Sequence, residues 1–197
     1  MRSPVLPGLI ATVCLLVPAH RAAAWQNGEE FSSIRIGLGP VVQVNSADID
    51  TAWEPGTGIG IVLTTPFYLG EVEVGYQFTP HSPITPDVPR FNSHYVYLDW
   101  RMPIRLTERL QWSGGYHLGA VQMKFRVPDS SWFGTAEHEL GTGFMTSLEW
   151  AVLKNWSARF SAVRRKTWFY KPLHQTFISI SILRRFSSPD RFREIFR

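Results

Sequence analysis

HQTFISISILRRF, at residues 174–186, is the stretch from which the fold can be inferred. Ile178, Ile180 and Ile182 alternate with two serines, and this period of two predicts a β-strand with one apolar and one polar face. The alternation alone leaves two orientations open. In a soluble sheet the isoleucines would lie in a core, whereas in a barrel that spans a membrane they would contact lipid and the serines would face the interior.

The beginning of the chain predicts a secretory signal peptide. Arg2 precedes an apolar run, and the run leads to an A-x-A cleavage site at residues 22–24. Cys14 lies within the run, but Val13 stands directly before it, where lipid attachment requires a small residue. The expected parts are a signal peptide at 1–24, one domain at 25–186 and a short C-terminal tail at 187–197.

The composition of the mature chain limits the kind of protein that it can be. Cleavage removes the one cysteine, so the secreted domain needs a good core or a closed, fully hydrogen-bonded sheet in place of disulfides. The full chain carries 20 basic and 16 acidic residues, and cleavage removes Arg2 and Arg21, which leaves a net charge near +2. A small charge on a secreted chain argues against nucleic acid as a partner. No later run approaches the roughly 18 apolar residues of a membrane-spanning helix, so strands would have to cross any membrane.

Eight segments of the mature chain share the alternation of residues 174–186. Most are about 9 to 14 residues long, which is enough for a tilted strand to cross a bilayer. Apolar side chains occupy every second position, and no helical period competes over a comparable length. The predicted strands are residues 31–44, 56–64, 68–78, 92–102, 110–125, 139–150, 156–166 and 174–186.

The connections between these segments alternate in length. Long connections follow the first, third, fifth and seventh segments, and the short ones are TPF, PIRLTER and AVLKN. Short periplasmic turns and long extracellular loops are typical of outer-membrane barrels. Four long loops and three short turns are what a transmembrane, eight-stranded, antiparallel up-and-down β-barrel requires.

Large aromatic side chains gather at the strand ends beside the short turns, on the same face as the isoleucines. On a closed barrel these positions form one ring, and such a girdle is explained by the preference of amphipathic rings for the membrane interface. A soluble core that places its tryptophans at one end is the alternative. The predicted girdle comprises Tyr68, Trp100, Trp112, Trp150, Trp156 and Phe186.

The opposite face combines glycines with charged residues of both signs. Glycine weakens a strand that faces solvent, but inside a narrow barrel it makes room for large neighbours. We expect Glu71 and Glu73 to face Arg101 and Asp99 in a paired network that plugs the interior, so the isoleucines face lipid. The predicted lumen charge network comprises Arg35, Glu71, Glu73, Asp99, Arg101, Glu149, Arg159 and Arg165.

Over residues 31–186 these features make the chain resemble the small OmpA/OmpX-type eight-stranded outer-membrane β-barrel proteins. TFISISILRRF looks like the terminal-strand signal of that family, with Phe186 as the terminal aromatic, although SSPDRFREIFR follows it here. The resemblance implies the bacterial outer membrane as the location and a structural or surface-interaction role. It also implies outer-membrane lipid, lipopolysaccharide and the barrel-assembly machinery as partners, and no cofactor.

Two alternative functions stay open. An enzyme acting on lipid A or another envelope lipid would need a serine, a histidine and an acid at the loop rim. DSSWFGTAEHELG, at residues 129–141, supplies such residue types and His81 and His94 flank the second long loop, but the His-x-Ser pair of lipid A deacylases does not occur. No metal site is expected, because successive strand residues point to opposite faces. A soluble, lipocalin-like binding barrel would not require the glycines and mixed charges of the second face.

Overall fold

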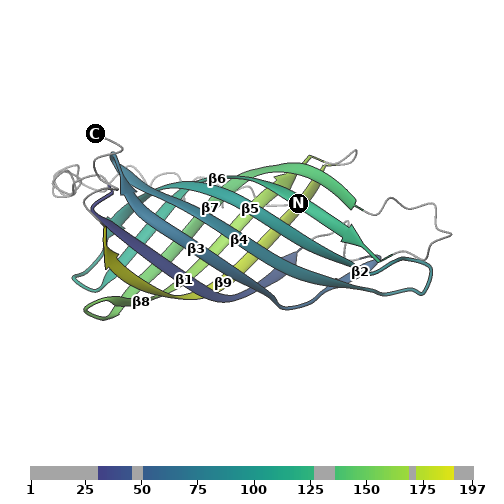
Figure 1. The fold of residues 1–197 in the computed structure, drawn as a ribbon, viewed down its shortest axis with the longest axis horizontal. Helices are drawn as coiled ribbons and strands as arrows, with labels where there is room; N and C mark the ends of the chain where they lie inside the picture. The colour runs from purple at the N-terminus through teal and green to yellow at the C-terminus, as the bar shows by residue number, and fades with distance from the viewer. Residues whose placement is uncertain (1–30, 46–50, 127–135, 169–171, 189–197) are drawn as a thin grey trace, which may run out of the picture.

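The structure is a closed barrel of antiparallel strands (Figure 1). The computed structural model describes residues 31–45, 51–126, 136–168 and 172–188, and no helix among them is long and apolar enough to cross a membrane. The eight long strands are β1 (Ser33–Asn45), β3 (Gly58–Phe67), β4 (Gly70–Pro83), β5 (Phe91–Arg105), β6 (Leu110–Phe125), β7 (Ala136–Leu153), β8 (Trp156–Thr167) and β9 (Leu173–Ser187).

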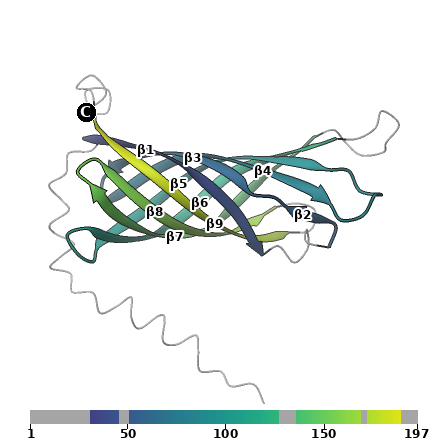
Figure 2. The same ribbon diagram turned by 90° about the horizontal axis from the view of Figure 1, so that it is seen from below.

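Each long strand pairs with the long strands before and after it in the chain, and β1 pairs with β9 to close the barrel (Figure 2). A short further strand, β2 (Trp53–Pro55), pairs with the end of β4 beyond the last contact of β3. This closed up-and-down order leaves every long strand with two partners. The predicted eight-stranded transmembrane-type fold is confirmed.

The two ends of the barrel differ in their connections. At one end, short turns join β3 to β4, β5 to β6 and β7 to β8, and we call this the turn end. At the other, the loop end, the connections that lead to β3, β5, β7 and β9 are longer. In Figure 1 the turn end lies at the left and the loop end at the right.

The strands are longer at the loop end than the alternation predicts. β4 continues to Pro83 instead of ending at residue 78, and β7 begins at Ala136 instead of residue 139. Pro80 pairs with Asn92 inside the ladder, although its sequence context predicts a loop. At the turn end, the TPF segment expected to connect two strands is the last part of β3. The turn itself is Tyr68 and Leu69, and Tyr68 has a φ of 46°, the positive value that two-residue hairpin turns require.

Apolar side chains cover the outside of the barrel, and polar ones fill much of its inside. Ile180 is 54% exposed, whereas the next residue, Ser181, is 8% exposed. A sheet that buries its serines and exposes its isoleucines does not fit a soluble, lipocalin-like barrel, which needs the opposite arrangement. The outward apolar band includes Ile36, Leu38, Ile59, Ile61, Leu63, Val74, Val96, Leu98, Leu118, Leu140, Phe144, Phe160, Ile180 and Ile182.

Two inward glycines show how the narrow interior is filled. A Cβ atom on Gly75 would lie 2.1 Å from the ring of Tyr97, so this glycine makes room for an inward aromatic side chain. A Cβ atom on Gly39 would lie 1.8 Å from the backbone oxygen of Ile180 on the neighbouring strand. Glycine is needed at both positions because the space that a side chain would occupy is already taken.

The predicted signal peptide at 1–24 lies outside the described residues. Of the predicted tail at 187–197, the structure describes Ser187, which ends β9, and Ser188. The amide of Ser188 donates a hydrogen bond to the carbonyl oxygen of Ser32, 3.2 Å away. The pairing of β1 with β9 therefore extends to the end of the described chain.

Candidate functional site

Three arginines and three glutamates form one closed ring of alternating charge inside the barrel, toward the turn end. We call it the charge ring. In order around the ring its members are Arg35, Glu71, Arg101, Glu73, Arg159 and Glu149, which contacts Arg35 again. All six side chains are at most 10% exposed. Because buried charges are tolerated only when they are paired, the alternation of sign lets all six stay inside.

The contacts of the charge ring cross the lumen. Arg159 on β8 contacts Glu73 on β4, and these two strands lie on opposite sides of the barrel. Arg159 also donates from Nη2 to Oε2 of Glu149 on the adjacent strand β7, at 2.7 Å. Nη1 of Arg35 on β1 donates to Oε1 of Glu149 at 2.9 Å, between strands that do not pair with each other. Side chains thus bridge the barrel from several directions at one level.

Hydroxyl groups support the charge ring. Thr64 donates from Oγ1 to Oε2 of Glu73 at 2.8 Å, and Nη2 of Arg101 donates to the same hydroxyl at 3.2 Å. Ser157 donates to Oε1 of Glu149 at 2.7 Å. The bonds from Thr64 and Ser157 give the two carboxylates donors in addition to the arginines, as buried charge networks require.

Two of the predicted lumen charges are buried but lie outside the charge ring. Asp99 stands directly opposite Glu73 in the β4–β5 ladder, but its carboxylate contacts His117 on β6. The expected register is therefore present, with Glu71 opposite Arg101 and Glu73 opposite Asp99, but the carboxylate of Asp99 pairs with a histidine on its other side and does not join the charge ring. The signal for His117 was present in the sequence, since it occupies an inward position in the alternation of residues 110–125.

Arg165 has a different environment. Its guanidinium lies over the rings of Tyr95 and Phe177, 4.0 and 4.1 Å from their centroids, and its Nε donates to Oε1 of Gln175 at 3.1 Å. Within the part of the chain that the structure describes, Arg165 forms no ion pair. Cation–π contacts and an amide take the place of a carboxylate.

A second group of side chains fills the lumen toward the loop end. Its buried members are Phe91, Tyr95, Val121, Met123 and Leu173, and we call it the aromatic plug. Trp53, Tyr97 and Phe125 pack against it, and the ring of His81 stacks on Phe91 at a centroid distance of 4.1 Å. The alternation of residues 92–102 predicts Tyr95 and Tyr97 as inward side chains. The rest of this group was missed, because single apolar residues among polar ones do not form a period of their own.

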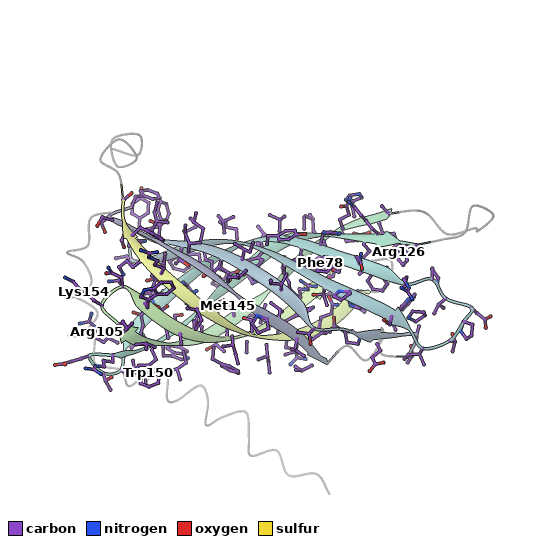
Figure 3. All side chains as sticks on the ribbon, turned by 60° about the horizontal axis from the view of Figure 1, so that its bottom comes forward. Phe78, Arg105, Arg126, Met145, Trp150 and Lys154 are labelled. Carbon is purple, nitrogen blue, oxygen red and sulfur yellow. The ribbon has the colours of Figure 1, made fainter. Side chains whose placement is uncertain are left out.

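The predicted girdle residues lie toward the turn end of the outer wall. Tyr68 and Trp150 are 71% and 56% exposed, and Figure 3 shows Trp150 beside Arg105 and Lys154 at this end. Trp112 is half-buried, and its indole nitrogen donates to the hydroxyl of Thr146, 2.9 Å away. The other three, Trp100, Trp156 and Phe186, are each about two-fifths exposed.

The comparisons with known proteins agree with this geometry. No protein-family model and no curated protein matches the sequence. Among solved structures the chain is similar to Neisserial surface protein A, with a TM-score of 0.53 and 10% identity over 78% of this chain and 96% of that one. It is also similar to Ail, the attachment invasion locus protein of Yersinia pestis, with a TM-score of 0.51 and 14% identity over 79% of this chain and 99% of that one.

The chain has the fold of the small outer-membrane barrels.

The histidines considered for catalysis fall on different faces of this outer-membrane barrel. His81 is buried in the lumen against Phe91, whereas His94 faces outward and is hydrogen-bonded through Nδ1 to the hydroxyl of Tyr76, at 2.7 Å. His138 also faces outward and lies 3.1 Å from the amide nitrogen of Gln122. Ser130 and Ser131 lie outside the described residues. Among the residues that are described, no three histidine, cysteine or acidic side chains converge to hold a metal ion.

Proposed function

We propose that this outer-membrane barrel is a non-enzymatic protein of structural or surface-interaction type in the bacterial outer membrane, with a plugged interior and four extracellular loops. The observation that carries the proposal is the charge ring, whose contacts join opposite strands. The outward apolar band supports the location, since such a band is stable in lipid and unfavourable in water. The surface at the loop end is then what the protein offers to a partner.

Two layers support the closed interior. The interior of an eight-stranded barrel is only wide enough for side chains to fill it. The charge ring occupies the lumen toward the turn end, and the aromatic plug occupies it toward the loop end. A solute would have to break paired charges and then displace packed rings, so transport through the lumen is disfavoured on energetic grounds.

The last strand supports a role for the barrel-assembly machinery as a partner. Phe186 lies near the end of β9, faces outward, and pairs with Ile34 on β1. β9 is also the strand whose free edge is covered only when the barrel closes onto β1. An exposed strand edge can pair with a strand of another protein. The assembly machinery could therefore bind β9 before β9 pairs with β1. Contact with lipid and lipopolysaccharide follows from the outward band.

The location is tested by fractionation and by heating. We expect the mature protein to be found with the outer membrane, and to migrate faster in detergent gels before heating than after it. A closed sheet has no edge from which detergent can unravel it, so the barrel stays compact until heated. Recovery of the mature chain from the periplasm without detergent would refute the proposed location.

The closed interior is tested by planar-bilayer recording. We expect no stable conductance steps from the purified wild-type protein, because both halves of the lumen are filled. Thr107→Ser, in a turn outside the lumen, serves as a preparation control. Regular single-size steps that persist in wild type, Arg101→Ala and Glu73→Ala alike would show an open channel and replace the interaction role with a transport role.

A further inference from the structure

A groove of about 580 Å³ lies on the outer wall of β4 to β7, in the half toward the loop end. Its floor is Ala120, whose direct cross-strand neighbours are Val96 and Leu140. These two side chains are 55% and 62% exposed, so a single methyl group lies between two projecting aliphatic walls. The volume is within the range of small-molecule sites in proteins.

Polar groups line the groove toward the loop end. Tyr76 and His94 form one hydrogen-bonded pair, and Gln122 and His138 form another. His94 also contacts Phe78, which Figure 3 labels on the wall between the turn end and Arg126 at the loop end. Polar groups that face the hydrocarbon of a bilayer are costly, so two such pairs on one patch of wall call for polar surroundings.

The outward residues on either side of the two hydrogen-bonded pairs indicate the depth of the groove in the membrane. Toward the turn end they are apolar, as at Val96 and Leu118, and toward the loop end they are polar, as at Asn92 and Lys124. Lys124 is exposed and pairs with Asn92, two positions from His94 on β5. The groove therefore lies where the apolar band meets the headgroups, with a cation beside it.

We propose that the groove binds one phosphate-bearing lipid of the outer leaflet, with an acyl chain over Ala120 and a phosphate at Lys124 beside His94. The inference rests on the proposed function, because only a membrane-embedded wall meets lipid. A lysine near the headgroups attracts anionic lipid. Glu139 also lines the groove, but its position in the alternation is inward, paired with Val121.

The probe is purified lipid A, compared with its dephosphorylated form, added to the folded protein in detergent and detected by native mass spectrometry. We expect wild type to retain one lipid A and to retain the dephosphorylated form less. Lys124→Met should lower retention of lipid A by roughly fivefold, the effect expected of one basic residue at an anionic surface. Ala120→Phe, which fills the floor, should lower retention of both forms.

Two matched substitutions serve as controls. Lys154→Met removes a lysine at the turn end, and Ala162→Phe enlarges an outward alanine on β8 that does not line the groove. Each variant is first shown to change mobility on heating, so a loss of binding is not a loss of fold. Equal retention of the two lipids, or equal losses in the control and groove variants, would refute the site while leaving the barrel intact. If the mature wild-type protein stayed folded and soluble without detergent, the proposed function would be refuted instead.

Discussion

Replacing Arg159 with methionine is expected to lower the free energy of unfolding by about 3 to 5 kcal/mol, because removing one cation of a buried ion network leaves it with an uncompensated negative charge. Arg159 contacts Glu73 on the opposite strand and donates from Nε and Nη2 to Glu149. Both carboxylates are buried and lose their shared cation in the variant. Equilibrium unfolding by guanidinium in detergent micelles measures the difference.

A neighbouring arginine supplies the control. Arg164 is on the same strand but faces outward, so Arg164→Met in micelles should change the free energy of unfolding by no more than about 0.5 kcal/mol. Adding Glu73→Gln to Arg159→Met removes the excess negative charge and should recover part of the lost stability. If Arg159→Met cost no more than Arg164→Met, the charge ring would not be a source of stability.

An arginine in place of Ile180 is expected to cost about 2 to 4 kcal/mol in a lipid bilayer, the penalty for this side chain at the midplane of a barrel wall. Ile180 is 54% exposed and pairs with Phe160, another outward apolar residue. The substitution therefore places a charge in hydrocarbon without disturbing the lumen. Equilibrium unfolding from phosphatidylcholine vesicles is the measurement that detects the loss.

The same substitution at another depth is the matched control. Val44 is 51% exposed near the loop end of β1, and an arginine there should cost no more than about 1 kcal/mol because the penalty falls toward the interface. Arginine at Ser179 is unsuitable, since this inward position and Arg165 line the same cavity of about 30 Å³. Equal costs at Ile180 and Val44 would contradict a lipid-facing wall.

The strands and their faces could be predicted from the sequence because both depend on local alternation. Residues 110–125 coincide with β6, and the outward position of Ile180 follows from the same period of two. The loop-end extensions of β4 and β7 were missed because proline and charged residues predict loops. Where the barrel extends beyond the bilayer, the strands stay paired but their outer face no longer contacts lipid. The alternation of apolar and polar residues therefore ends before the strand does.

The residues that face the lumen could be predicted from the sequence, but the contacts between them could not. Alternation identifies inward residues one strand at a time, but contacts such as Arg35 with Glu149 join strands that are not neighbours. These contacts depend on the tilt and stagger with which the sheet closes, and those are properties of the whole barrel. For the same reason the sequence grouped Arg165 with the other charges, although it lies against Tyr95 and Phe177.

The charge ring also has a consequence for the time course of folding. Arg35 and Glu149 are separated by 114 positions in the chain, and Glu73 and Arg159 by 86. Contacts between such distant residues form late, because a long loop of chain has to be ordered first. No single hairpin contains both members of either pair. Contacts that form late do not stabilise the partly folded barrel, but they must be broken before the native barrel can unfold. The charge ring therefore slows unfolding more than it speeds folding.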